Sequence, residues 1–143
     1  MSKQYEASPK FSDYLKPSEF FDFHTDTLIE YGRQLVGNES DPVEFAKRLY
    51  LGVRDDIQYN AYTFDFSASS FSASHCLKAG ESYCIPKAVL LGALCRLYEI
   101  PARIGLADVK NHMASPQFLE YLKSDVFVMH GYTDLFLDGK WVK

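Results

Sequence analysis

The stretch CIPKAVLLGALCRLYEIPARIG, residues 84–105, decides the fold of this protein. Its first part would be apolar on nearly every side of a helix, which is typical of the buried central helix of a domain. Pro86 fits the first turn, where a missing N–H costs nothing, and Ile100-Pro101 ends the helix. The alternating residues 102–107 then predict a strand. We therefore expect a central helix that leads directly into a sheet.

Helices are predicted before this stretch. One is expected from Asp41, because an Asp cap, Pro42 in the first turn and apolar residues at helical spacing follow one another. Another helix, which Asp26 could cap, precedes it. The Ser- and Ala-rich residues 60–75 have no helical period and predict a loop.

Strands are predicted after the central helix. Residues 126–137 are rich in β-forming side chains, and the Asp-Gly pair at 138–139 is typical of a hairpin turn. A short amphipathic helix starting near Ser115 precedes them. This order predicts an α+β domain, in which N-terminal helices and the buried central helix pack against an antiparallel sheet of C-terminal strands. We assign an N-terminal arm to residues 1–24 and the domain to residues 25–143.

The composition excludes several classes of protein. A chain of 143 residues can bury one core without a metal or disulfide. The net charge is −4 and no block of Lys and Arg occurs, which argues against nucleic-acid binding. No apolar run approaches the roughly 20 residues of a membrane helix, and residues 1–11 do not resemble a signal peptide. With three cysteines and no C-x-x-C pair, we expect reduced thiols in a cytoplasmic protein.

Cys84 is the candidate nucleophile because it stands at the start of the central helix. The first N–H groups of a helix lack partners within the helix and carry partial positive charge, so a thiolate is stabilised there. The same groups can hold the oxyanion that forms when a thiolate attacks an amide carbonyl. Taken alone, a free Cys is more often a buried small hydrophobe. That interpretation is favoured for Cys95. Cys76, beside His75 in a loop, could be a reactive thiol but lacks the helix terminus.

His130 is the candidate general base. A thiol nucleophile needs a base within hydrogen-bond reach. His130 lies inside the apolar strand VFVMHGY, where an unpaired imidazole would be costly to bury. A structural histidine with satisfied hydrogen bonds is the alternative. The other candidates, His24, His75 and His112, lie before a helix or in loops.

Three segments together resemble the transglutaminase-like superfamily. The family pattern has V-x-D-x-I-x-Y, a G-x-C helix start, a helix end L-R-x-x-G-I-P-A-R, a strand H-A-W-x-E-V-Y, and then W-x-x-x-D. Order and spacing agree over about residues 45–143, and IPAR at 100–103 is the most specific piece. The matching segments are IQYN at 57–60, Gly80 through Cys84 to RLYEIPARIG at 96–105, and HGYTDLFLDGKWV at 130–142.

The resemblance implies a papain-like fold and a Cys-His-Asp triad, with Cys84 as nucleophile and His130 as general base. Two departures are Ser82 in place of Gly and Tyr132 in place of Trp. Counting from the final Trp places the triad Asp at position 145, beyond Lys143. We expect a domain truncated at its C-terminal end, although a natively incomplete domain or another orienting residue would also fit.

Asp134 is the fallback for the third member of the triad. By strand alternation it shares a side with His130. It lies some four strand rises away, which is too far for contact in a regular strand. Papain-type sites also use an upstream side chain as a second oxyanion donor. Tyr59, Asn60 and Tyr62 are candidates for this role, and ordinary structural roles are the alternative for each.

The first functional hypothesis is thiol-dependent acyl transfer on amide bonds, of the peptidase, amidase or transglutaminase type. Hydrolysis is favoured because it needs only water as acceptor, and a protein or peptide substrate is expected. The alternative is a catalytically inactive binding or scaffold domain. No cofactor is indicated, and no metal requirement, because the sequence has no acidic loop of the calcium type. A zinc site from His75, Cys76, Cys84 and His112 is a further alternative, but its spacing is poor. If the last strand is missing, a homodimer could form through an exposed sheet edge.

Overall fold

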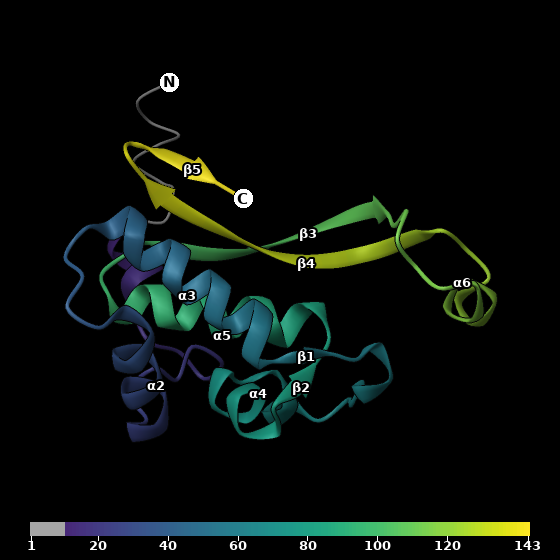
Figure 1. Ribbon diagram of the computed structural model, residues 1–143, viewed down its shortest axis with the longest axis horizontal. Helices are drawn as coiled ribbons and strands as arrows, with labels where there is room; N and C mark the ends of the chain where they lie inside the picture. The colour runs from purple at the N-terminus through teal and green to yellow at the C-terminus, as the bar shows by residue number, and fades with distance from the viewer. Residues whose placement is uncertain (1–10) are drawn as a thin grey trace.

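The computed structural model describes residues 11–143, so the first ten residues of the predicted arm lie outside the described part. In this part, helices lie beneath an antiparallel sheet with strand order β3-β4-β5 (Figure 1). The predicted α+β class is therefore confirmed. The helices are α2 (Asp26–Val36), α3 (Pro42–Asp56), α4 (Ala73–Ala79), α5 (Cys84–Leu97) and α6 (Pro116–Leu122), and the strands of this sheet are β3 (Ala102–Lys110), β4 (Val126–Leu137) and β5 (Lys140–Val142).

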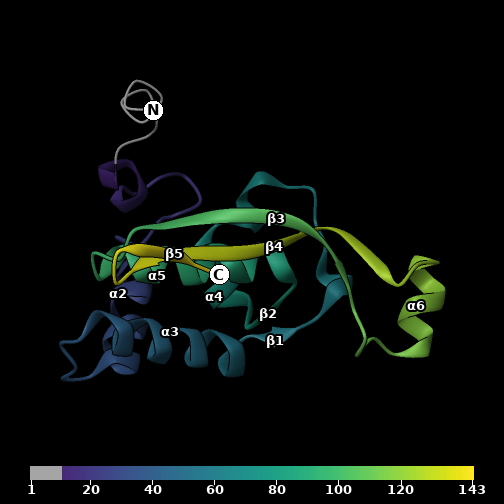
Figure 2. The same cartoon turned by 90° about the horizontal axis from the view of Figure 1, so that it is seen from above.

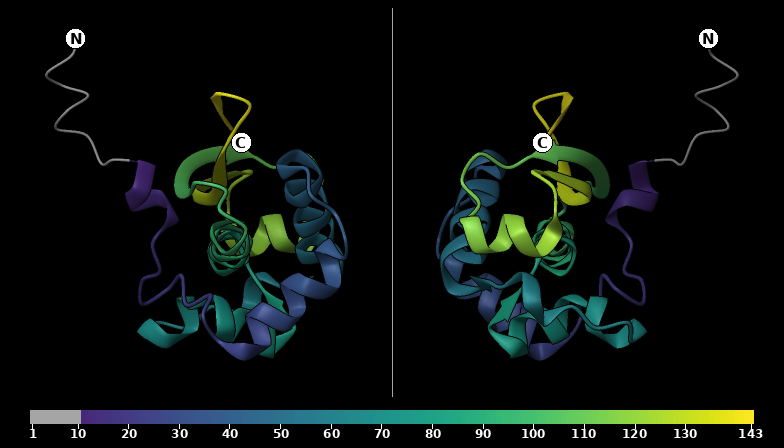
Figure 3. Two further views of the ribbon diagram at one scale, coloured as in Figure 1. Left: turned by 90° about the vertical axis from the view of Figure 1, so that its left-hand side faces the viewer. Right: turned by 90° about the vertical axis from the view of Figure 1, so that its right-hand side faces the viewer.

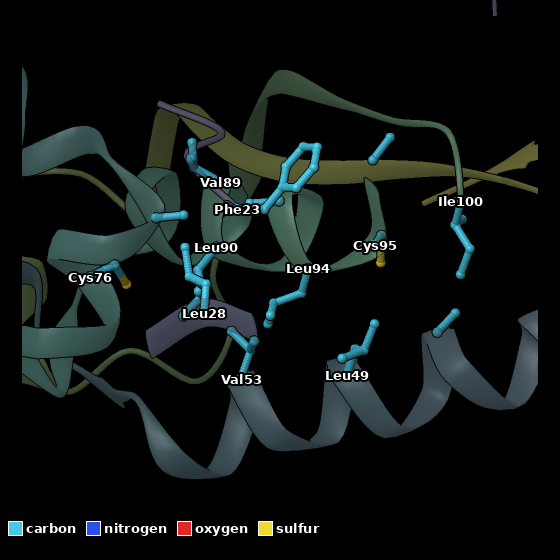
Figure 4. Packing of buried hydrophobic residues seen from close by; sticks show 14 of the residues in the cluster. Phe23, Leu28, Leu49, Val53, Cys76, Val89, Leu90, Leu94, Cys95 and Ile100 are labelled. Atoms are coloured by element: carbon cyan, nitrogen blue, oxygen red, sulfur yellow. The ribbon is translucent and has the colours of Figure 1, made fainter. Parts of the chain in front are cut away.

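Helix α5 lies at the centre of the molecule. The sheet covers it from above, α3 runs along one side, and α2 and α4 lie below (Figures 1 and 3). Leu90, Leu94 and Cys95 are fully buried, as expected for a helix that is apolar on nearly every side. Figure 4 shows this core, which also includes Phe23, Leu28, Leu49, Val53, Cys76, Val89 and Ile100.

The start of α3 is as predicted. The Asp41 side chain accepts hydrogen bonds from the Val43 and Glu44 amides at 2.8 and 3.1 Å, and Pro42 occupies the first turn. These bonds satisfy amides that would otherwise lack partners at the helix terminus. The apolar face that follows places Leu49 and Val53 in the core.

The prediction of a loop at residues 60–75 is wrong in part. The structure has two short 3-10 helices there, η2 (Ala61–Thr63) and η3 (Ala68–Phe71), and α4 begins at Ala73. The Ser72 side chain caps α4 by accepting from the His75 amide. Burial of Cys76 adds stabilisation that a seven-residue helix could not supply by itself. Two turns are too short to show a helical period, which explains why the sequence did not reveal them.

The described residues of the predicted arm lie against the rest of the chain. The 3-10 helix η1 (Phe11–Leu15) packs on β4 and β5, with the Phe11 and Phe136 ring centroids 4.5 Å apart. Tyr14 meets the Trp141 ring at 5.1 Å. Further on, Phe23 is only 5% exposed and belongs to the core. The boundary at residue 24 stays a prediction.

We predict that Leu94→Ala lowers the free energy of unfolding by roughly 2–5 kcal/mol, because it leaves a cavity in the centre of the core. Leu51→Ala is the matched control, because Leu51 is 43% exposed on α3. It should change the free energy of unfolding by less than about 0.5 kcal/mol. Urea denaturation measures both. Equal effects would mean that α5 is not the centre of the core.

Candidate active site

Cys84 is the first residue of α5, and the chain reaches it through a short parallel strand pair. Strand β2 (Glu81–Ser82) pairs with β1 (Gln58–Tyr59) in the register Tyr59↔Ser82. The N-cap residue Tyr83 makes no side-chain capping bond, so no side chain at the cap occupies the amides of the first turn. The Cys84 side chain is partly exposed. An accessible thiol therefore stands at a helix N-terminus.

Tyr59 is brought to Cys84 by this pairing. Its hydroxyl lies close to the thiol and the amide of Cys84. The pKa of Tyr59 is raised, first because the ring is partly buried and then because of the neighbouring Cys84. A carbonyl oxygen drawn to the Cys84 amide would thus also be within reach of this hydroxyl.

Strand β4 comes exceptionally close to the first turn of α5 at Gly131. A Cβ added to Gly131 would lie 2.8 Å from Ile85 Cγ1 and 3.0 Å from Ile85 Cα. Real Cβ atoms do not approach that closely, so glycine is what allows the contact. The sequence analysis missed this residue, although a glycine within a strand is a known sign of close backbone approach. The contact fixes the segment carrying His130 beside the residue that follows Cys84.

Cys84, His130 and Tyr59 line one cavity of about 540 Å³. It lies between α3, α5 and the edge of β4 that faces away from β3. Thr133 supports the same wall, because its hydroxyl donates to the Ala88 carbonyl at 2.9 Å. The other lining residues are mostly apolar, and they include Val43, Ala46, Tyr50, Val53, Leu91, Leu135, Leu137 and Val142.

The sheet edge at this cavity is only partly paired. Strand β5 pairs with β4 at Leu135–Leu137. Within residues 11–143, the preceding part of β4 has no strand partner on that side. Figure 2 shows β5 as a short strand along one end of β4. A homodimer through this edge stays a prediction.

The other two candidate oxyanion donors have different contacts. The Asn60 side chain accepts from the Tyr62 amide at 3.0 Å and donates to Glu81 at 3.4 Å, so it caps η2. The Tyr62 ring packs against α6, with its centroid 5.9 Å from that of Phe118. Of the three candidates, Tyr59 is therefore the one that lies close to Cys84.

Asp134 interacts with Arg103. Its carboxylate accepts from Arg103 Nε at 3.1 Å, and the guanidinium also lies 3.9 Å from the Trp141 ring centre. Among the hydrogen bonds of the described residues, none joins Asp134 to His130. Tyr132 lies between them along β4, and its ring covers Gly105 on the neighbouring strand. In this structure the carboxylate links β4 to β3.

The other two cysteines are unlike Cys84. Cys76 is 1% exposed, and burial raises the pKa of its thiol to about 11. Cys95 is fully buried, and burial raises the pKa of its thiol as well. Both thiols therefore stay protonated and shielded near neutral pH. This agrees with the structural role expected for Cys95 and separates Cys84 as the accessible thiol.

Over residues 11–143, no cluster of three or more His, Cys, Asp or Glu side chains could hold a metal ion. In the same range, no helix is both long and apolar enough to cross a membrane.

This fold, with a cysteine opening its central helix and a strand histidine at the same cavity, defines a papain-like class of domain. The chain belongs to the transglutaminase-like superfamily, whose sequence model matches residues 29–143. The family predicted from the three sequence segments is therefore confirmed. No curated protein matches the chain.

Two solved structures share the fold. A proposed cysteine protease from Cytophaga hutchinsonii superposes with a TM-score of 0.70 at 18% identity, over 97% of this chain and 42% of that one. A proposed protease from Parabacteroides distasonis ATCC 8503 gives 0.54 at 12% identity, over 94% of this chain and 26% of that one. The chain thus spans less than half the length of either protein. At these identities the likeness concerns the fold alone.

We predict that Gly131→Ala destabilises the protein by about 1–3 kcal/mol, because the new methyl group would overlap Ile85. Urea denaturation measures the loss. The double variant Ile85→Ala/Gly131→Ala is the control: it removes the 2.8 Å contact with Cγ1 but keeps the 3.0 Å contact with Cα. In the Ile85→Ala background, Gly131→Ala should still lower the free energy of unfolding. The loss should be smaller than the loss that Gly131→Ala causes in the native protein. An unchanged stability for Gly131→Ala would contradict the close packing.

Proposed function

We propose that the protein cleaves amide bonds in a peptide or protein by thiol chemistry, with Cys84 as nucleophile and His130 as general base. The observation that carries this proposal is that the accessible Cys84 thiol, at the N-terminus of α5, shares one cavity with His130 and Tyr59. Membership of the transglutaminase-like superfamily supports it. A protein of this kind needs no cofactor for the reaction.

In the first half-reaction, the His130 imidazole accepts the Sγ proton of Cys84, and the thiolate attacks the amide carbonyl carbon. The C–S bond forms, the C–N bond breaks, and His130 returns the proton to the leaving amine. In the second half, His130 takes a proton from water, which attacks the thioester. The C–S bond then breaks and Cys84 regains its proton. The net change is amide plus water to acid plus amine.

We propose Tyr59 and the first amides of α5 as the oxyanion donors. The negative charge on the carbonyl oxygen develops only during attack, so donors already aimed at that position lower the barrier. The contact of the Tyr59 hydroxyl with both the amide and the thiol of Cys84 supports this role. A second amine could replace water in the second half-reaction, but hydrolysis is the simpler outcome because water is always present.

We propose that the third member of the triad stands at position 145, where the family pattern W-x-x-x-D places an Asp when it is counted from Trp141. The pairs Leu137↔Lys140, Phe136↔Trp141 and Leu135↔Val142 each advance by one residue. Continued in this register, position 145 would stand opposite Tyr132, on the same side of the sheet as His130 and one diagonal step away. A carboxylate there could accept from the His130 ring.

We predict that iodoacetamide labels Cys84 before Cys76 and Cys95, and that labelling continues below pH 7. A free thiol ionises near pH 8.5, so labelling at lower pH indicates a stabilised thiolate. In His130→Ala the pH profile should move upward, because the imidazolium partner is lost. Mass spectrometry identifies the labelled residue, and His112→Ala serves as the control. A profile that is the same in the native protein and in His130→Ala would favour the scaffold alternative.

We predict that Tyr59→Phe slows acylation of Cys84 by a reactive nitrophenyl ester by roughly 100- to 1,000-fold, because one oxyanion donor is removed. Release of nitrophenolate measures the rate. Tyr50→Phe is the matched control, because Tyr50 is a tyrosine that lines the same cavity from α3. Equal rates in Tyr59→Phe and Tyr50→Phe would remove Tyr59 from the oxyanion site.

A further inference from the structure

A β-bulge precedes His130 in strand β4. The pairing of β3 with β4 is regular up to Ala107↔His130 and resumes at Val109↔Phe127. Between these pairs, the single residue Asp108 faces two residues of β4. Bulges of this kind change the direction of a strand and occur often beside active sites. The irregularity therefore lies immediately before the proposed general base.

The bulge contains a residue in an unusual conformation. Met129 has φ +54°, in the left-handed region that residues other than glycine rarely adopt. Its amide donates to the Asp108 carboxylate, with Met129 N and Asp108 Oδ1 2.9 Å apart. Met129 is 61% exposed and Asp108 is also exposed, so core packing does not explain this conformation. The hydrogen bond that the Met129 amide donates to the neighbouring strand is the contact that holds it.

The extra residue decides which side chain of β4 faces α5. Side chains alternate along a strand, so a shift of one residue moves each to the other face. With the bulge, Gly131 faces Ile85 and His130 pairs with Ala107. If the extra residue were absorbed by a slip of β4 past β3, His130 would take the position of Gly131. That position has no room even for a methyl group.

We propose that Asp108 is a positioning residue for His130, whose carboxylate holds the Met129 amide and so keeps the bulge in place. The expected effect of Asp108 on Cys84 reactivity rests on the proposed function of His130. Its expected effect on the backbone of the bulge does not. Asp108 acts through the backbone of β4 and need not touch a substrate. Its required property is an acceptor oxygen rather than a charge.

The test compares Asp108→Ala with Asp108→Asn, which keeps an acceptor oxygen. Asp108→Ala should slow Cys84 labelling at pH 6.5 by roughly 10- to 100-fold and move the pH profile toward that of His130→Ala, because the base is displaced. Asp108→Asn should label like the native protein. Adding Met129→Gly to Asp108→Ala should restore labelling, since glycine adopts a positive φ without steric cost. Asp125→Ala, which removes an exposed carboxylate paired with Lys110 on the same hairpin, should have no effect.

Carbon chemical shifts of residue 129 in each variant give a readout independent of chemistry, because they report the sign of φ. Asp108→Ala should lose the positive-φ signature and Asp108→Asn should keep it. Retention of the signature in Asp108→Ala, or loss of labelling equally in both variants, would overturn the proposal. If His130→Ala leaves native labelling unchanged, the proposed function fails. The chemical shifts alone then decide whether Asp108 holds the bulge.

Discussion

The site depends on one contact, in which the backbone of β4 at Gly131 touches the first turn of α5 at Ile85. Burial of α5 requires the sheet to cover it, and the absence of a side chain at residue 131 lets the sheet come close enough. The bond from Thr133 to the Ala88 carbonyl continues the same contact one turn further along the helix. Because Cys84 begins this helix and His130 precedes this glycine, packing of the core also assembles the candidate site.

Tyr59 reaches the site by a different route. It comes with β1, whose parallel pairing with β2 is confirmed by bonds from Gln58 to Gly80 and from Asn60 to Ser82, at 3.0 and 2.8 Å. Tyr59 therefore reaches Cys84 through strand pairing, and His130 reaches the same cavity through packing of the sheet on the helix. These two connections involve chain segments far apart in sequence. This explains why the order and spacing of the motifs were more informative than any one of them.

The sequence predicted the features that depend on local signals. The central helix, the Asp41 cap and the hairpin at 138–139 were of this kind. Cys84 and His130 were proposed from their positions in predicted elements and from the family pattern. The two-turn helix α4 has no measurable period and could not be found in this way. The partner of Asp134 was also beyond reach, because Arg103 becomes its neighbour only through the register of β3 and β4. The bulge before His130 likewise follows from pairing between strands.

Strand β4 carries residues that pack on α5 and also carries the proposed base. Gly131, Thr133 and Leu135 face α5, and each is buried. Asp134 alternates with them and accepts from Arg103, which links the strands, whereas His130 borders the cavity that also holds Cys84. A substitution on the face toward α5 must change the distance between helix and sheet, and so moves the thiol relative to the base. A substitution of His130 itself changes the proposed base while the contacts of Gly131 and Thr133 with α5 stay in place. The direction of His130 must therefore come from the strand itself and from the groups beside its face.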